Sequence, residues 1–237
     1  MLKPSGDVVV LWRRARRLCG GDFIGLEEGE RSGGLLLMYA VRIHGRGGQG
    51  VVTAAELLSL AAFVDGKYAQ AFPSFGSERM GAPVMAFCRI ATQLIRTREA
   101  VTRPDVLIVQ DPTLLHQVEI FSGLSPGGYV LINSTFSLAE LGIGDFLKSM
   151  PPDHVCVVPA SDIGVKHLRR PIANTPLLGA FAGMTGVIAL ESVQSAMRQK
   201  FSGALGEANA AAAKDGYDQV ISSMAREGSG VHHARAT

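Results

Sequence analysis

Cysteine is scarce in this chain: only three occur in 237 residues, and they lie far apart. Cys19, Cys88 and Cys156 show no CxxC spacing and no histidine-rich neighbourhood, so they predict neither a disulfide framework nor a zinc or iron–sulfur ligand set. We expect them to be small buried side chains in a reducing compartment. The sequence therefore predicts a cytoplasmic protein that binds no metal with residues of its own.

An excess of charge of one sign is also missing. Lysine and arginine number 23 against 21 aspartates and glutamates, which leaves a formal net charge of +2. Proteins that bind nucleic acid or an anionic membrane surface usually concentrate positive charge. The charge balance therefore argues against nucleic acid as a partner.

No apolar run reaches the roughly 18 residues that a transmembrane helix needs. The nearest candidate, residues 175–190, is interrupted by Pro176 and several glycines, and is better interpreted as a buried helix. Because 47% of the residues are nevertheless apolar, we expect other subunits to cover part of the hydrophobic surface.

The chain divides into one domain and two flanking segments. Residues 1–37 are first basic and apolar, then acidic and rich in turns, and they lack the apolar core and cleavage site of a secretory signal. Met38 directly precedes the first convincing strand. We therefore expect an N-terminal extension over 1–37, a folded domain over 38–225 and a C-terminal tail over 226–237.

Within the domain, strand patterns alternate with helix patterns, separated by short loops. This order predicts a three-layer α/β/α fold around a mostly parallel, Rossmann-like sheet. The expected strands cover 38–45, 68–72, 84–90, 106–109, 129–133 and 154–160, with the second and third able to pair. The expected helices cover 51–64, 113–121, a segment starting near 160 with Ser161 or Asp162 as N-cap, one long helix from about 177 to 192, 192–201 and 207–223.

A loop with the spacing GxGxxG follows the first strand and precedes the first helix. It contains Gly45, Gly47 and Gly50. Glycines allow the backbone to turn sharply and to approach a phosphate at the helix N-terminus, which favours a nucleotide. Arg46 and Gln49 within the loop also suit an anionic or polar partner. The alternative is a tight turn that only lets the helix pack on the sheet.

Two kinds of nucleotide site lack residues that they require. A P-loop needs Lys-Ser or Lys-Thr after the last glycine, and neither is present. An NAD site needs a carboxylate at the end of the second strand. Asp65 instead comes before that strand, which ends at Phe72-Pro73. A free-standing dinucleotide-binding enzyme is therefore the weaker interpretation.

A second loop, over residues 72–83, combines two aromatic residues with glycines and with Ser77-Glu78-Arg79. Alone, it could be an ordinary loop between strands with solvated charges. Together with the glycine loop it completes a larger pattern. The order of GRGGQGVVTAAELL, DGKYAQAFPSFGSERMGAPV, PDVLIVQDPTLL, GGYVLIN and RPIANTPLLGAFAGMTG resembles the gamma subunit of 2-oxoacid:acceptor oxidoreductases, of the pyruvate:ferredoxin oxidoreductase type. The similarity runs from Tyr39 to Val220.

The resemblance implies one part of a larger enzyme. Such enzymes oxidatively decarboxylate a 2-oxoacid with coenzyme A, giving an acyl-CoA and carbon dioxide, and pass electrons to ferredoxin or, through a flavoprotein, to NAD. Thiamine diphosphate and [4Fe-4S] clusters are held by other subunits of the alpha, beta and delta types. The gamma module is expected to help bind coenzyme A and to bridge subunits, with no catalytic residue of its own.

The resemblance also implies which residues line the ligand site. Pyruvate is the favoured substrate because of the FPSFGxER form, and arylglyoxylates remain possible. Family members often have a second arginine where this chain has Met80, so a paired phosphate clamp is not expected. The residues carried over are Gly45, Arg46, Gly47, Gly48, Gln49 and Gly50 of the glycine loop, Ser77, Glu78, Arg79 and Gly81 of the second loop, and Asn174 and Thr175.

Overall fold

The computed structural model describes residues 38–74, 80–97, 99–151 and 153–233, and within 226–233 it describes the backbone only. The N-terminal extension, Ser77, Glu78 and Arg79 lie outside the described residues.

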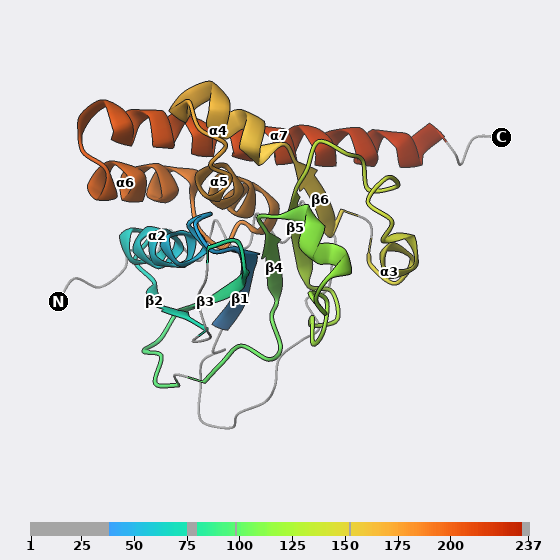
Figure 1. Cartoon of the computed structure of the whole chain (residues 1–237), viewed down its shortest axis with the longest axis horizontal. Helices are drawn as coiled ribbons and strands as arrows, with labels where there is room; N and C mark the ends of the chain where they lie inside the picture. Colours follow the sequence, from blue (N-terminus) through green and yellow to red (C-terminus); the bar gives the residue numbers. More distant parts are fainter. Residues whose placement is uncertain (1–37, 75–79, 98, 152, 234–237) are drawn as a thin grey trace.

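One six-stranded sheet forms the centre of the fold, in the order β2-β3-β1-β4-β5-β6 (Figure 1). Strands β1, β4, β5 and β6 are parallel, whereas β3 runs antiparallel to both β1 and β2. This confirms the expected α/β class and the pairing of the second and third strands. The strands are β1 Met38–Arg46, β2 Tyr68–Pro73, β3 Pro83–Ala91, β4 Val106–Val109, β5 Tyr129–Asn133 and β6 Val155–Val158.

The two faces of the sheet are covered unequally. One face carries two tiers of helices, with α7 on the outside (Figure 1), and the other carries the 3-10 helix η1, the short helix α3 and loops. The helices are α2 Val51–Val64, η1 Pro112–His116, α3 Gly144–Lys148, α4 Ala160–Leu168, α5 Asn174–Thr185, α6 Leu190–Lys200 and α7 Gly203–His233.

Strand β1 shows how the sequence pattern produces two cores. Val41 and Ile43 belong to the core under the helices, whereas Ala40 and Arg42 face the opposite side. Side chains of a strand alternate between faces, so this pattern places the apolar positions against the helices. Strand β4 is buried on both faces, as its continuous apolar run predicts.

The long helix expected over about 177–192 was wrong, because the chain forms two helices there. Helix α5 ends at Thr185, and Gly186 follows in the left-handed conformation with φ 59°. Helix α6 begins only at Leu190. A left-handed glycine after the last turn is a frequent helix terminator.

The helix expected over 113–121 was also wrong, since only the last four residues of η1, Thr113 to His116, are helical there. Buried Arg42 binds the segment that follows η1. Its Nη2 donates hydrogen bonds to the carbonyl oxygens of Ile120 and Ser122, at 2.7 and 2.6 Å. The segment after η1 is therefore held against a side chain of β1.

The expected N-cap of α4 was a third error. The helix begins at Ala160, directly after Pro159, so Ser161 already lies within it. Asn133 of the neighbouring strand serves the helix terminus instead: its Oδ1 accepts from the Ser161 backbone N–H at 3.0 Å, and its Nδ2 donates to Ser161 Oγ at 2.9 Å.

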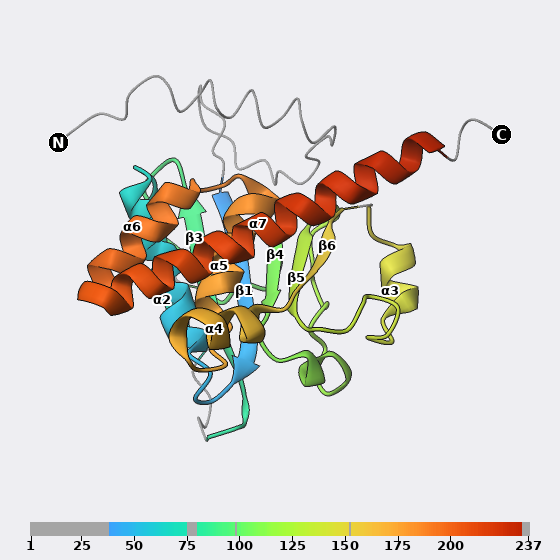
Figure 2. The ribbon, with the colours of Figure 1, turned by 90° about the horizontal axis from the view of Figure 1, so that it is seen from above.

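Helix α7 crosses the whole helical layer and extends past β6 (Figure 2). It continues to His233, beyond residue 225, where we expected a tail to begin. No helix in the described ranges is both long and apolar enough to span a membrane.

Helices α5 and α7 pack backbone to backbone. A Cβ built on Gly179 of α5 would lie 1.7 Å from the Ala213 carbonyl oxygen, and one on Gly216 of α7 would lie 2.0 Å from that of Pro176. Such distances cannot be tolerated, so both positions require glycine. Gly183, one turn after Gly179, has more room: its nearest contacts would be 3.2 Å away, on Tyr217.

Replacing Gly179 with alanine should therefore destabilise the chain by about 3 kcal/mol, because α5 must move away from α7. Gly183→Ala is the matched control on the same helix, and it should stay within about 1 kcal/mol of the wild type, since alanine favours a helix. Denaturant unfolding of the two variants measures the difference. Equal effects would show that the two helices are not in backbone contact at Gly179.

Candidate functional site

The candidate site lies where β1 and β4 end side by side. After β1 the chain passes to α2, in the core under the helices, whereas after β4 it passes to η1, in the core on the other face. Neighbouring parallel strands whose connections leave to opposite faces open a crevice at their carboxyl ends. Ligands of open α/β sheets commonly bind there.

The glycine loop adopts conformations that need glycine. Gly48 and Gly50 have φ values of 92° and 74°, and Gly50 is the N-cap of α2. A Cβ on Gly45, which lies in β1, would be 2.6 Å from Val51 Cγ2. The spacing of the glycines thus reflects both sharp turning and the close packing of α2 on the sheet.

The structure brings the glycine loop together with the described end of the second loop. The backbone N–H of Gly47 donates to the Ala82 carbonyl at 2.9 Å, and that of Gly81 donates to the Gly47 carbonyl at 3.1 Å. A Cβ on Gly48 would lie 2.8 Å from Met80 Sδ. The two segments identified from the sequence therefore form one edge of the crevice.

Arg46 is occupied within the chain. Its Nε lies 3.1 Å from Asp111 Oδ2, and its Nη1 donates to the Gly81 carbonyl at 3.1 Å. Its Nη2 donates to Thr113 Oγ1 and Gln117 Oε1, at 2.6 and 2.8 Å. The guanidinium thus ties both loops to η1, whereas the sequence suggested an anionic partner for it.

Gln49 is tied to the same carboxylate. Its Nε2 donates to Asp111 Oδ2 at 2.8 Å, and its Oε1 accepts from the Arg46 backbone N–H at 2.8 Å. Asp111 Oδ1 accepts from the backbone N–H and the hydroxyl of Thr113, at 3.0 and 2.5 Å. The sequence analysis assigned Asp111 no role at the site. The available signal was a carboxylate followed by Pro-Thr at the start of a helix, which is an N-cap pattern.

Partial burial alone would raise the pKa of the Asp111 carboxyl. Hydrogen bonds from Thr113 and Gln49, together with the charge of Arg46, outweigh that effect and lower the pKa below its usual value. Asp111 is therefore ionised at neutral pH and neutralises Arg46.

Asn174 and Thr175 differ in where they point. A Cβ on Gly50 would be 2.9 Å from Asn174 Nδ2, so that amide lies against the glycine loop. The hydroxyl of Thr175 donates instead to Asn209 Oδ1 on α7, at 2.9 Å. Both residues are buried. Asn174 lies against the glycine loop, and Thr175 connects α5 to α7.

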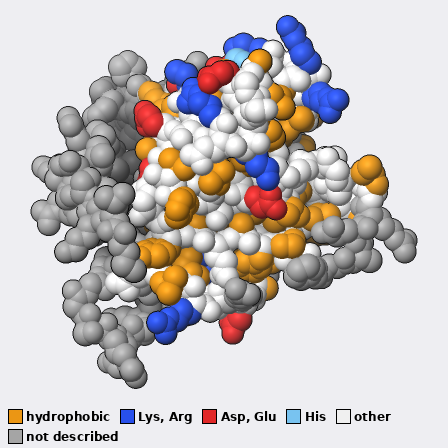
Figure 3. Space-filling view, turned by 90° about the vertical axis from the view of Figure 1, so that its left-hand side faces the viewer, with side chains coloured by type: hydrophobic (Ala, Val, Ile, Leu, Met, Phe, Trp, Pro, Cys, Tyr) orange, Lys and Arg blue, Asp and Glu red, His pale blue; other side chains and the backbone are white. Residues whose placement is uncertain are grey.

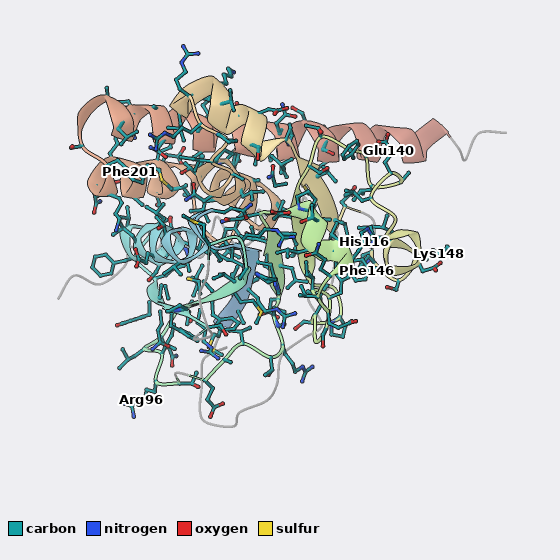
Figure 4. All side chains as sticks on the ribbon, viewed as in Figure 1. Arg96, His116, Glu140, Phe146, Lys148 and Phe201 are labelled. Atoms are coloured by element: carbon teal, nitrogen blue, oxygen red, sulfur yellow. The ribbon has the colours of Figure 1, made fainter. Side chains whose placement is uncertain are left out.

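A cavity of about 180 Å³ occupies the crevice. Its walls come from the carboxyl ends of β1, β4 and β5 and from the start of α4 and α5: Gln49, Gln110, Asp111, Pro112, Asn133, Ser161, Pro171 and Ala173. A wider depression of about 440 Å³ lies between η1 and α3. Figure 4 shows His116 and Phe146 at this second place, which none of the predicted site residues lines.

The carboxylate considered for an NAD site has a different task. Asp65 follows the C-terminus of α2, at the far end of that helix from the glycine loop. Its Oδ1 accepts from Ser192 Oγ at 2.6 Å and from the Ala189 backbone N–H at 3.2 Å, and its other oxygen pairs with Lys67. Asp65 thus fixes α2 to the start of α6, which weakens the dinucleotide interpretation further.

Cys88 and Cys156 are both buried, and Cys19 lies outside the described residues. Within the described ranges, no three histidine, cysteine, aspartate or glutamate side chains gather in a way that could hold a metal ion.

These features define the class: an α/β protein whose glycine loop and second loop meet at the topological switch point of a mixed sheet. A family model for pyruvate ferredoxin/flavodoxin oxidoreductase matches residues 40–219. The chain belongs to this family and is a gamma-type subunit of a 2-oxoacid oxidoreductase. The resemblance inferred from the sequence is thereby confirmed.

Curated relatives agree over nearly their full length. The pyruvate/ketoisovalerate oxidoreductases common subunit gamma of Thermococcus kodakarensis is 48% identical over 184 residues, which cover 78% of this chain and 98% of that protein. Pyruvate synthase subunit PorC of Methanothermobacter marburgensis is 46% identical over 183 residues, covering 77% and 98%.

Solved structures share the fold. Pyruvate oxidoreductase subunit PORC of Thermotoga maritima has a TM-score of 0.65 at 38% identity, covering 77% of this chain and 96% of that one. A 2-oxoglutarate:ferredoxin oxidoreductase of Magnetococcus marinus, solved with 2-oxoglutarate, coenzyme A and succinyl-CoA bound, has a TM-score of 0.62 at 16% identity. The match covers 78% of this chain and 31% of that one, and at this identity it shows the fold alone.

Asp111→Asn should destabilise the chain by about 2 kcal/mol. The new amide N–H₂ group would face the N–H donors of Arg46 or Gln49, and the charged acceptor would be lost. Asp145→Asn on α3 is the matched control. Its carboxylate is fully exposed and pairs with Lys148, so its loss should cost less than about 0.5 kcal/mol.

The stability difference between the wild type and Asp111→Asn should also depend on pH. The folded-state pKa of Asp111 is lowered, so its stabilisation is complete above the unfolded pKa, about 3.9, and is lost as the pH falls through the folded value. Denaturant unfolding between neutral pH and pH 3 should show wild type and Asp111→Asn converging at low pH. A difference that persists undiminished at pH 3 would contradict the role assigned to the charge.

Proposed function

We propose that this chain helps to bind coenzyme A in a 2-oxoacid oxidoreductase and bridges the subunits that carry the other cofactors. The observation that carries the proposal is the hydrogen-bonded contact between the glycine loop and Gly81 at the switch point. This contact lies beside the carboxyl end of β1. It joins the glycine loop and the second loop, for which the sequence suggested a ligand.

The glycine loop suits the phosphates of coenzyme A. Helix α2 begins at a glycine and has no side-chain cap, so backbone N–H groups of its first turn remain available to a ligand. The positive end of the helix dipole lies at the same place. Arg46 adds little attraction because Asp111 neutralises it, so Arg79 of the second loop would supply the cationic side chain.

The residues of this chain would bind and orient coenzyme A, and the chain would carry no catalytic residue. Thiamine diphosphate, when bound by the complex, supplies the carbanion chemistry of decarboxylation, and [4Fe-4S] clusters carry single electrons. Holding the thiol carrier in place converts its reaction with the acyl group into an effectively unimolecular step.

Apolar side chains on the surface support a bridging role. Figure 3 shows orange apolar side chains among charged ones over the face that it presents. Met80, Phe63 and Leu94 are 90%, 74% and 65% exposed. Such side chains are compatible with burial by neighbouring subunits. The proposed partners are alpha, beta and delta-type subunits, with ferredoxin or a flavoprotein as acceptor.

The names of the relatives guide the choice of substrate and compartment. Thermococcus kodakarensis has a subunit common to pyruvate and ketoisovalerate oxidoreductases, and the Methanothermobacter marburgensis subunit belongs to a pyruvate synthase. We therefore propose pyruvate as the first substrate to test, with the complex in the cytoplasm.

Gly48→Ala tests the role of the glycine loop. A Cβ would strain the left-handed backbone and collide with Met80, which should displace both loops and raise the KM for coenzyme A in the assembled enzyme on the order of 10-fold. Gly66→Ala is the matched control: it has a similar φ of 76° with nothing within 4 Å of a Cβ. An equal KM in the two variants would remove the loop from coenzyme A binding.

Arg79→Ala tests the second loop. Arg79 directly precedes Met80 and Gly81, which contact the glycine loop. Loss of its charge should raise the KM for coenzyme A about 10-fold, as expected for one charged hydrogen bond, while the 2-oxoacid still reduces the complex in the absence of coenzyme A. Arg96→Ala serves as the control, since Arg96 is exposed (Figure 4) and follows the end of β3 beside the start of β1. An unchanged KM in Arg79→Ala would exclude this contact.

A further inference from the structure

Strand β2 forms one edge of the sheet, and in the described part of the chain it pairs only with β3. Its six residues, YAQAFP, include no charged side chain. Edge strands of natural proteins are commonly protected by charges, bulges or a covering element, because their unpaired backbone groups can bond to another strand. The edge of β2 is therefore a candidate surface for the addition of a strand.

The register with β3 shows which backbone groups of β2 face outward. The N–H of Ser74 donates to the Met85 carbonyl at 2.9 Å, so these two residues form a hydrogen-bonded pair. Hydrogen-bonded and non-hydrogen-bonded pairs alternate along an antiparallel ladder. Phe72 and Gln70 therefore bond to β3, and the residue between them directs its N–H and C=O groups away from the sheet.

The outward groups belong to Ala69 and Ala71, which each present one N–H and one C=O. No hydrogen bond to another described residue uses these groups. The two side chains pack on the core under the helices, so they leave the edge open. The free stretch ends on both sides, because Pro73 has no N–H and the N–H of Lys67 already donates to the Ala62 carbonyl at 2.9 Å.

These outward groups are complementary to those of a second copy of the same strand. If two copies run antiparallel about a twofold axis beside Gln70, Ala69 of each copy lies opposite Ala71 of the other. Each of these two pairs exchanges two hydrogen bonds, so this register uses every outward group of both strands. Interfaces with twofold symmetry require such self-complementarity.

The side chains on the opposite face of β2 also match in this register. Tyr68 of one copy lies opposite Phe72 of the other, and Gln70 lies opposite its own copy. Aromatic pairs across strands are stabilising, whereas like charges placed opposite each other are destabilising. The strand has no charged side chain, and in the turn before it Asp65 pairs with Lys67. The two edges therefore meet without charge repulsion from these residues.

Exposed apolar side chains beside β2 provide further area for an interface. Four hydrogen bonds correspond to only about 400–800 Å², and a stable interface buries about 1,200–2,000 Å². Phe63, in the last turn of α2, is 74% exposed, Tyr68 is 49% exposed, and Leu94, shortly after β3, is 65% exposed. Figure 3 faces the side of the molecule on which α2 and β2 lie, and apolar side chains are visible there.

We propose that two copies of this chain pair through β2 about a twofold axis at Gln70, so that their two six-stranded sheets form one continuous sheet. The pairing belongs to the assembled oxidoreductase and does not depend on coenzyme A binding. Because the second loop directly follows β2, the pairing also fixes the base of that loop in both copies.

Cysteine cross-linking in the assembled oxidoreductase tests the register. Gln70→Cys, in a Cys19→Ser background, places two thiols opposite each other in a non-hydrogen-bonded pair. The Cα atoms of such a pair are about 4.5 Å apart, which a disulfide can span. Oxidation with diamide should convert most of the chains to covalent dimers on a non-reducing denaturing gel. Tyr68→Cys is the matched control, because its two copies lie four residues apart, roughly 14 Å, and should stay monomeric.

A proline at position 71 tests the backbone hydrogen bonds. The N–H of Ala71 points away from β3, so Ala71→Pro keeps the ladder between β2 and β3, and denaturant unfolding checks that the fold persists. The substitution removes one donor from each copy. The dissociation constant of the dimer of the full chain, measured by sedimentation equilibrium, should rise on the order of 10-fold or more.

Covalent dimers of Gln70→Cys, with Tyr68→Cys monomeric, support the pairing. An assembled enzyme in which Gln70→Cys stays monomeric overturns it, whether the edge is free or covered by a strand of another subunit. Equal cross-linking of the two cysteine variants also overturns it, since that result indicates random collision. An unchanged dissociation constant in folded Ala71→Pro excludes pairing through the backbone, and if that variant does not fold, the cross-linking result decides.

Discussion

The carboxylate of Asp111 is the point on which the candidate site depends. It stands at the end of β4 and accepts hydrogen bonds from Arg46, Gln49 and Thr113. These donors come from the end of β1, the glycine loop and the start of η1, which lead to opposite faces of the sheet. A single ionised group therefore holds together the two chain segments that would otherwise diverge at the crevice.

This ion pair also determines how the glycine loop can attract an anion. Arg46 is the cation of this loop, but its N–H groups donate hydrogen bonds within the chain. The acceptors are Asp111, Gly81, Thr113 and Gln117. Attraction must then arise from backbone N–H groups at the start of α2, which has no side-chain cap. The side chain of Arg46 therefore connects the glycine loop to Gly81 of the second loop and to η1.

The sequence predicted correctly those helices, strands and loops that are determined by neighbouring residues in the chain. The bounds of α2 and β4 follow from apolar periodicity and flanking turn residues, and the glycine spacing identified the loop. The segment after His116 is held by Arg42, which bonds the carbonyls of Ile120 and Ser122 from a strand 78 and 80 residues away, and no local pattern shows this. The end of α5 at Thr185 had a local signal in Gly186, which the prediction of one continuous helix passed over. The hydrogen bonds of Asp111 to the glycine loop span more than 60 residues, and no local pattern reveals them.

The helical layer sets the remaining wall of the site. Asn174, the first residue of α5, lies against Gly50, so its position depends on where α5 rests. Gly179 and Gly216 let α5 and α7 meet backbone to backbone, and Thr175 bonds to Asn209 of α7. Contacts between backbones leave little freedom to slide, because any shift produces a collision between main chains rather than between adjustable side chains. Two rigid contacts thus position the residues around the crevice. One is the ion pair between Arg46 and Asp111, and the other is the glycine-mediated contact between α5 and α7. Groups held in this way need little reordering when a ligand binds, which favours both affinity and orientation.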